Sequence, residues 1–253
     1  MTGLRVLVRK ELLEQVRTMR LVVLAIVFIL FGIISPLTAK YLPDLLKTLG
    51  GTGLTITVPT PTTADAVDQQ LKNVSQFGIL AAILLAMGSV ATEKERGTAA
   101  FVLSKPVSRA AFLTAKLVAI GVDLLVAVAG AVLVGALYTA FLFEPLPIAG
   151  VIEMGVVLWL SIMVFAALTF VGSTLTRSAA GGAGVGFALL VVTGILGALP
   201  TIGPYMPASL IGPARALALG HDAGAGLGPI MVNIALVPVL GVVGWLAFRH
   251  QEL

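Results

Sequence analysis

Of the 253 residues, 58% are hydrophobic and 11% are charged, whereas about 25% of the residues of a soluble domain are charged. This composition and the mean hydropathy of +1.07 predict one integral membrane domain over residues 1–253. The absence of cysteine excludes disulfides, thiolate catalysis and cysteine-ligated metals, and with two histidines we expect no metal on this chain. The formal net charge is +4, but the basic residues cluster beside apolar runs, which is typical of membrane orientation and not of nucleic-acid binding.

The pattern of residues 1–20 predicts an amphipathic helix. Apolar residues recur at three- and four-residue steps from Leu4 to Met19, while Arg5 and Arg9 occupy part of the other side. Such a helix suits the head-group region of a bilayer, with its apolar face toward the lipid. The alternative is a positively charged flank that only orients the first span. A cleavable signal peptide fits less well, because the segment contains acids.

Six apolar stretches predict an all-α polytopic fold. At 1.5 Å per residue, about 20 residues cross a hydrocarbon core of about 30 Å. The predicted spans are residues 21–39, 74–91, 117–141, 151–175, 181–199 and 229–248. A polar excursion separates the first two spans, and its residues 64–73 are expected to form a short helix that leads into the second.

The second half of the chain contains many glycines and prolines. Gly182 and Gly186 share one face of the fifth span, which favours close packing of a neighbouring helix. Residues 200–228 are broken by Pro and Gly but stay fairly apolar, so pieces at 208–211 and 214–219 are candidates for re-entrant helices.

The distribution of basic residues predicts the orientation. Six spans place both termini on one side, together with twelve of the sixteen Lys and Arg residues. Lys40, Lys47, Lys72 and Arg215 lie on the other side. Because cytoplasmic loops carry the excess of Lys and Arg, we expect a multi-pass protein of the cytoplasmic membrane with cytoplasmic termini.

The connector between the second and third spans is unusually charged. Residues 92–116 hold five of the sixteen basic residues and two of the twelve acids. Residues 99–103 predict a short helix on the membrane surface, which Pro106 ends, and Ser108 is placed to cap the third span. One alternative is that these charged residues are an ordinary solvent-exposed segment with no specific partner. The more specific hypothesis is a rigid coupling segment, residues 92–109, which converts a push from below into tilting of two spans.

The sequence contains no motif for nucleotide or catalytic chemistry. It has no G-x-x-x-x-G-K-[ST] phosphate loop, no H-E-x-x-H helix and no G-x-S-x-G turn. We therefore expect that this chain is not an enzyme and that it does not bind ATP through such a loop.

Asp123 lies inside the third predicted span, about 10 Å into the hydrocarbon core. A central acid costs roughly 2.5–3.5 kcal/mol on insertion scales, which the surrounding apolar residues outweigh, so its side chain should face the bundle interior. Asp123 is either a polar contact for a substrate or proton, or a structural partner for Lys116 two turns away or for a polar group on another helix. Asn233 in the sixth span poses the same choice, with the structural role favoured.

The connector sequence EKERGTAAFVLSKPVSRAAFLTAK resembles the cytoplasmic connector of type-2 ABC exporter permeases (the ABC-2 family). The matching residues are Glu93, Glu95, Arg96, Gly97, Thr98, Pro106, Ser108, Arg109 and Lys116. The similarity continues in the leader, at Arg9, Lys10 and Glu11, and in the C-terminal residues Phe248, Arg249, Glu252 and Leu253.

The resemblance implies that the leader and connector pack against a separate nucleotide-binding subunit, which holds ATP and Mg. The implied interface comprises Arg9, Lys10, Glu11, Glu93, Lys94, Glu95, Arg96, Gly97, Thr98, Pro106 and Arg109. It also implies a dimer with a second permease copy or a paralogue, and export of a substrate that the spans do not identify. Two alternatives remain open: an ATP-independent carrier or channel that uses Asp123, and a non-transporting membrane anchor.

Overall fold

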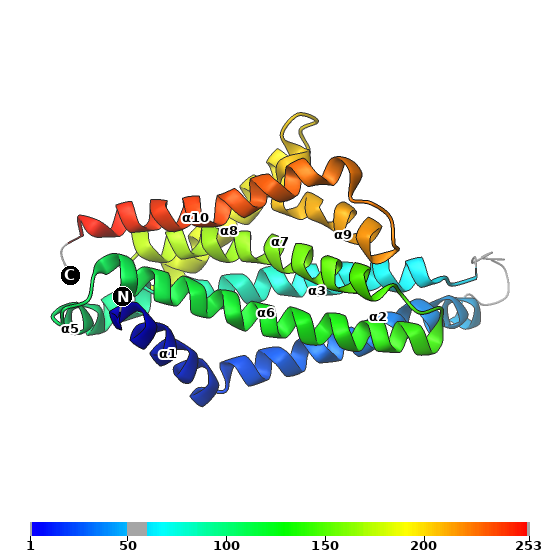
Figure 1. Ribbon diagram of the computed structural model, residues 1–253, viewed down its shortest axis with the longest axis horizontal. Coiled ribbons are helices and arrows are strands. Elements are labelled where there is room, and N and C mark those ends of the chain that lie inside the picture. Colours follow the sequence, from blue (N-terminus) through cyan, green and yellow to red (C-terminus); the bar gives the residue numbers. More distant parts are fainter. Residues whose placement is uncertain (1, 50–59, 252–253) are drawn as a thin grey trace.

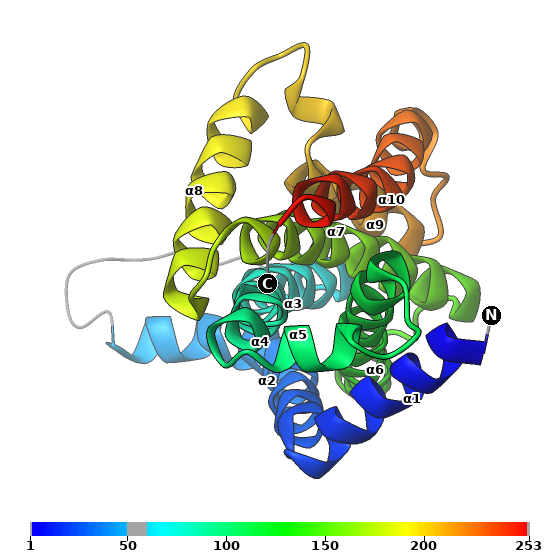
Figure 2. The ribbon, with the colours of Figure 1, turned by 90° about the vertical axis from the view of Figure 1, so that its left-hand side faces the viewer.

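The computed structural model describes residues 2–49 and 60–251, and within them every regular element is helical. Six helices are long and apolar enough to cross a membrane. They are α2 (Arg20–Leu49), α3 (Thr63–Met87), α6 (Arg109–Leu142), α7 (Ile148–Leu175), α8 (Ala179–Gly197) and α10 (Leu227–Arg249). They lie roughly side by side along the long axis, and α8 is splayed away from the others (Figures 1 and 2). The predicted all-α, six-span, multi-pass membrane fold is confirmed.

Several helices extend beyond their apolar stretches. Helix α2 continues through Lys40 and two prolines, Pro36 and Pro43. Helix α3 begins at Thr63, so the short helix expected at residues 64–73 is its first part. Thr62 caps it: the Thr62 hydroxyl accepts a hydrogen bond from the Asp65 backbone, and the Asp65 carboxylate accepts one from the Thr62 backbone. A helix need not stop where the hydrocarbon stops, so hydropathy alone underestimates these lengths.

Helix α7 forms the centre of the bundle. Met154, Leu158, Ile162 and Phe170 are fully buried along it, and α3, α8 and α10 pack around it. In contrast, α8 and α10 expose most of their apolar surface. Lipid tails are as apolar as Leu, so burial here gains close packing and polar contacts more than transfer out of water.

Small residues set the closest helix–helix approaches. A Cβ at Gly32 of α2 would collide with the Ala131 carbonyl of α6, and one at Gly182 of α8 with the Met87 carbonyl of α3. Gly186 lies against the side chain of Thr169 on α7. The packing role predicted for Gly182 and Gly186 is confirmed.

Buried amide side chains join the spans. Gln70 of α3 donates to the Ala131 carbonyl of α6 at 2.9 Å. Asn233 of α10 donates to the carbonyls of Tyr205 and Pro229, at 3.1 and 2.9 Å. These bonds give the buried amide N–H groups partners that lipid cannot supply, which favours the structural interpretation of Asn233.

The segment between α8 and α10 is a chain of short helices. It contains η1 (Gly203–Tyr205), η2 (Pro207–Leu210), α9 (Ile211–Ala218) and η3 (Gly224–Gly226). At about 12 Å, α9 is too short to cross a membrane; it packs against α7 in the half of the bundle farther from α1 (Figure 1). Ser161 of α7 donates to the Pro207 carbonyl at 2.8 Å, so protein covers part of this backbone. The two separate pieces expected here are one 3₁₀ turn followed directly by one α-helix.

Helix α1 (Thr2–Arg17) joins α2 through a sharp turn. Met19 at this turn has φ of 59°, in the left-handed region. As a result α1 runs at an angle to α2 and crosses the bundle at the end where α10 also finishes (Figures 1 and 2). We call this the termini end.

Candidate functional site

At the termini end, the connector between α3 and α6 folds into two short helices, α4 (Ala91–Glu95) and α5 (Thr98–Leu103). The short helix predicted at residues 99–103 is α5, and α4 is an additional turn. Gly97 joins them with φ of 69°, a left-handed conformation that glycine adopts at little cost. Ser108 accepts a hydrogen bond from the Ala111 backbone at 3.1 Å, so the predicted cap of the third span is confirmed.

Helix α4 is attached to the centre of the bundle. The Ser173 hydroxyl of α7 accepts hydrogen bonds from the backbone N–H groups of Val90 and Ala91, at 3.1 and 3.0 Å. The first N–H groups of a helix have no partner within it, so this buried side chain supplies one. The start of α4 is therefore bonded directly to α7.

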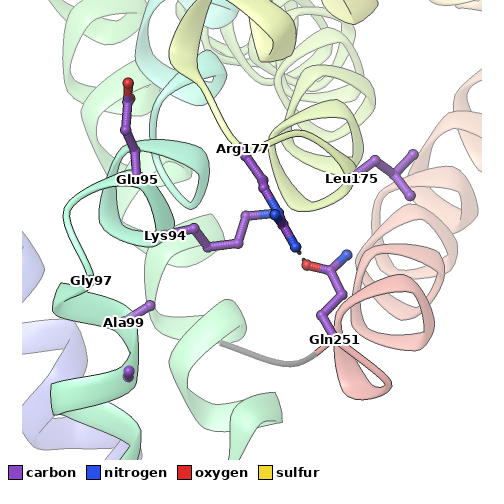
Figure 3. A pocket seen from close by; sticks show the side chains of 8 residues that line it. Lys94, Glu95, Gly97, Ala99, Leu175, Arg177 and Gln251 are labelled. Atoms are coloured by element: carbon purple, nitrogen blue, oxygen red, sulfur yellow. Dashed lines mark hydrogen bonds between the residues drawn. The ribbon is translucent and has the colours of Figure 1, made fainter.

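Lys94 ties α4 to the ends of two spans. Its ammonium group donates to the Thr174 carbonyl at 2.6 Å and to Gln251 Oε1 at 3.2 Å. Gln251 in turn donates to the Thr174 carbonyl at 2.9 Å. These side chains line a cavity of about 850 Å³ together with Arg177, whereas Glu95 points away from them (Figure 3).

Four charged side chains from α1, α4 and α6 meet in an ion cluster, composed of Lys10, Glu11, Glu93 and Lys116. The Lys116 ammonium of α6 donates to Glu93 Oε1 at 2.6 Å and to both Glu11 oxygens at 3.3 Å. Lys10 lies 2.9 Å from Glu11 Oε1 and 3.7 Å from Glu93 Oε1. The Lys116 side chain is only 4% exposed, so one buried cation joins three elements that are far apart in sequence.

Burial and the neighbouring carboxylates shift the pKa of Lys10 in opposite directions. Partial burial lowers the pKa of Lys10, but the hydrogen bond and negative charge of Glu11, together with Glu93 and Glu14, outweigh it and raise the pKa. Lys10 therefore stays charged at neutral pH. Removing one member of a buried ion cluster leaves an uncompensated charge and lowers the free energy of unfolding by about 3–5 kcal/mol. The intact cluster itself adds little stability.

Arg109 holds the end of α10 against the start of α6. One of its guanidinium nitrogens donates to the carbonyls of Phe248, Arg249 and Gln251, at 3.1, 2.8 and 3.0 Å. Phe248 and Arg249 are the last residues of α10, so their carbonyls lack the usual helical partner four residues on, and a cation there also suits the helix dipole. The chain thus uses Arg109 to fix its own C-terminal helix.

The residues predicted for a partner interface divide into two groups. Those turned inward, or partly so, are Lys10, Glu11, Glu93, Lys94 and Arg109, each of which bonds within the chain. Those on the surface are Arg9, Glu95, Arg96, Gly97, Thr98 and Pro106. Phe101 of α5, which we did not predict, is 68% exposed beside them. Arg9 belongs to α1; the other surface residues and Phe101 form what we call the outer face of the connector.

Sequence reasoning missed Ser173, Thr174 and Gln251. Each is roughly 80 residues or more from its connector partner, and Ser and Thr inside an apolar span carry no special signal. The predicted C-terminal matches at Glu252 and Leu253 lie outside the described residues.

Asp123 is fully buried, and neither of its carboxylate oxygens accepts a hydrogen bond from the described part of the chain. Lys116 turns to Glu11 and Glu93 instead, so the suggested pairing of Asp123 with Lys116 is wrong. Side chains on a helix lean toward its N-terminus, which takes Lys116 toward the connector and away from Asp123. Arg20, at the start of α2, acts on Asp123 electrostatically.

Within residues 2–49 and 60–251, no group of three His, Asp or Glu side chains is placed to hold a metal ion. The ion pairs and main-chain contacts of the site suit mechanical attachment between helices.

Comparison with known families agrees with this arrangement. The family described as "ABC-2 family transporter protein" matches residues 5–209, from α1 through η2. The chain belongs to the ABC-2 transporter family. It is also 27% identical to an uncharacterized transmembrane protein, YxlG, of Bacillus subtilis (strain 168), over 252 residues that cover 97% of each chain.

The ABC-2 match includes the elements that build the ion cluster. Residues 5–209 contain most of α1 and all of α4, α5, α6 and α7, whereas α10 lies outside the match. The similarity to YxlG extends through nearly the whole chain.

Proposed function

We propose that the chain is the membrane-spanning permease subunit of an ABC exporter. A separate nucleotide-binding subunit would hold ATP and Mg, hydrolyse the ATP and drive export of a substrate across the cytoplasmic membrane. Membership of the ABC-2 family supports the permease role, and the lack of a phosphate loop in this sequence suits an ATPase on another polypeptide.

The observation that carries this proposal is the ion cluster. In the proposed mechanism the ATPase contacts the outer face of the connector, at Glu95, Arg96 and Phe101. A push there displaces α4, whose Glu93 is bonded to Lys116 of α6 while Lys116 is bonded to Glu11 of α1. The same displacement acts on α7 through Ser173. One contact thus reaches three helices through bonds shorter than 3.5 Å.

The proposal includes an orientation and a second subunit. The termini end would be cytoplasmic, and the excess of basic residues at that end supports this orientation. The outward surfaces of α8 and α10, which are mostly exposed in one chain, provide room for a second permease copy or a paralogue as well as lipid. The cargo is any substrate that the two permeases enclose.

The test uses the chain co-expressed with a candidate ABC ATPase subunit. Reversing the charges of Glu93, Glu95 and Arg96 together is expected to abolish transport-linked ATPase stimulation while the permease remains inserted in the membrane. Reversal of Glu144, an exposed acid at the opposite end, serves as the control. Normal stimulation in the triple variant contradicts the coupling role.

A second function, an ATP-independent carrier, rests on Asp123. A buried acid without a hydrogen-bond partner is expensive inside a membrane and is a default candidate for an ion or proton site. This alternative requires the purified chain alone to carry out gradient-driven flux, which Asp123→Asn would abolish. Flux that needs the ATPase and survives Asp123→Asn rejects it.

A further inference from the structure

A groove of about 1080 Å³ opens beside the ion cluster, slightly larger than the roughly 300–1,000 Å³ typical of ligand pockets. Parts of α1, the start of α2, the end of α3, α4 and α5 line it, and these elements lie together at the termini end (Figure 2). It is distinct from the cavity beside Lys94 and Arg177.

The wall of this groove is apolar. Val23 and Val27 of α2 face Phe77, Leu80 and Leu84 of α3 across it, and each of these side chains is at least 39% exposed. The wall on α3 extends from residue 77 to residue 87, which corresponds to about 15 Å along the bundle. Both helices cross the membrane, so this wall lies where lipid chains run.

The mouth of the groove is charged: its carboxylates have partners among the described residues of the chain, whereas two of its arginines do not. Its carboxylates, on Glu11, Glu14 and Glu93, all contact Lys10 or Lys116. Arg20 and Arg96 also line the groove and are exposed, and neither forms a hydrogen bond or ion pair with a described residue. The mouth therefore has two guanidinium groups available for an anion, and guanidinium matches phosphate oxygens with paired N–H donors.

We propose that this groove binds an anionic phospholipid from the leaflet at the termini end. The head-group phosphate lies at Arg20 and Arg96, and an acyl chain lies along the wall formed by α2 and α3. Basic pockets beside membrane-spanning helices attract anionic head groups in this way. The lipid would fill the space between α1 and the connector, so the leaflet itself completes the packing around the ion cluster. The inference does not rest on the proposed transport function. Arg96 and Phe101 border both the groove and the outer face of the connector, so the lipid and the proposed ATPase would meet along this edge.

Brominated lipids test the proposal on the purified chain in bilayers, without an ATPase. Leu84→Trp places a fluorescent reporter in the wall, and the signal of Trp159 and Trp245 is subtracted with the unmodified chain. Brominated phosphatidylglycerol is expected to bind at least about fivefold better than brominated phosphatidylcholine, since each basic side chain near the head groups contributes about 1 kcal/mol of attraction.

Variants that remove or keep the positive charge distinguish binding at Arg20 and Arg96 from general effects of substitution on the protein. Arg20→Gln with Arg96→Gln should bring the ratio of the two lipids to about one, while Arg20→Lys with Arg96→Lys should keep a preference. Arg177→Gln, an exposed arginine at the same end but on the other cavity, should change nothing. A reporter at Leu137, exposed on α6, should show no preference.

Three results overturn the proposal. Equal quenching by both lipids at residue 84 excludes a site for anionic lipid. A preference that survives in the double Gln variant excludes Arg20 and Arg96 as its source. No quenching by either lipid means that something else, such as a second copy of the chain, covers the groove.

Discussion

The ammonium group of Lys116 illustrates how one residue can join distant parts of this protein. It contacts carboxylates of α1 and α4 while its own backbone belongs to α6. Sequence comparison indicated the residue types, but the spacing of Lys116 and Asp123 suggested the wrong partner. The actual partners lie 105 and 23 residues away, and such distances are set by packing, which a single sequence does not display.

Substitution of Lys116 tests the ion cluster. Lys116→Met leaves Glu11 and Glu93 without their main counter-charge, so the free energy of unfolding should fall by about 3–5 kcal/mol, measured by thermal or denaturant unfolding in detergent. Lys72→Met, at an exposed lysine on α3, is the matched control and should change stability little. Equal unfolding midpoints for the two variants would show that the cluster carries no such penalty.

The left-handed turn at Gly97 permits a second residue-level prediction. No atom lies within 4 Å of a Cβ built on Gly97, so a substitution meets only backbone strain. Gly97→Ala should therefore destabilise by about 1–2 kcal/mol, seen as a lower thermal midpoint. Gly184→Ala, equally open but helical, should be neutral or stabilising. Identical shifts in both variants would mean that φ at residue 97 is not the cause.

At the scale of elements, α4 and α5 show how a five-residue and a six-residue helix can be held rigidly. Isolated helices of this length are unstable in water, and here Ser173 and Thr174 of α7 supply contacts to α4, while Thr98 of α5 donates to the Glu93 carbonyl. The charge pattern and Pro106 predicted a short helix at the surface, and α5 confirms it. The attachment to α7 was not predictable, since it depends on a hydroxyl in an apolar span.

Removal of the Ser173 hydroxyl should loosen α4. Ser173→Ala leaves the N–H groups of Val90 and Ala91 without a partner, at a cost of about 1–3 kcal/mol. We expect faster hydrogen exchange at α4 and weaker ATPase stimulation, with no change at α9. Ser104→Ala, at the exposed end of α5, is the control. Unchanged protection of α4 would show that Ser173 does not anchor it.

At the scale of the whole molecule, the lipid bilayer determines which features of the fold can be predicted from the sequence. Lipid requires long apolar helices with internally bonded backbones, so six spans and the all-α class follow from hydropathy. Their neighbours do not follow, because approaches such as Gly32 to Ala131 and Gly182 to Met87 depend on which small residues meet. The splayed position of α8 was likewise invisible in the pattern.

The proposed orientation has its own test, because the natural chain has no cysteine. A cysteine at Thr98 should react with a membrane-impermeant thiol reagent only after the cytoplasmic side is exposed, whereas one at Glu144, in the loop between α6 and α7, should react in intact cells. The reverse pattern would place the connector outside and remove the basis for a cytoplasmic partner.

The central claim is that the outer face of the connector binds a separate ATPase. Single cysteines at Glu95 and Phe101 of the otherwise cysteine-free chain can be tested with a short bifunctional cross-linker in membranes that contain both subunits. We predict that both positions cross-link to the ATPase and that a cysteine at Glu144 does not. Absence of cross-links from Glu95 and Phe101, while the two subunits still co-purify, would contradict the account.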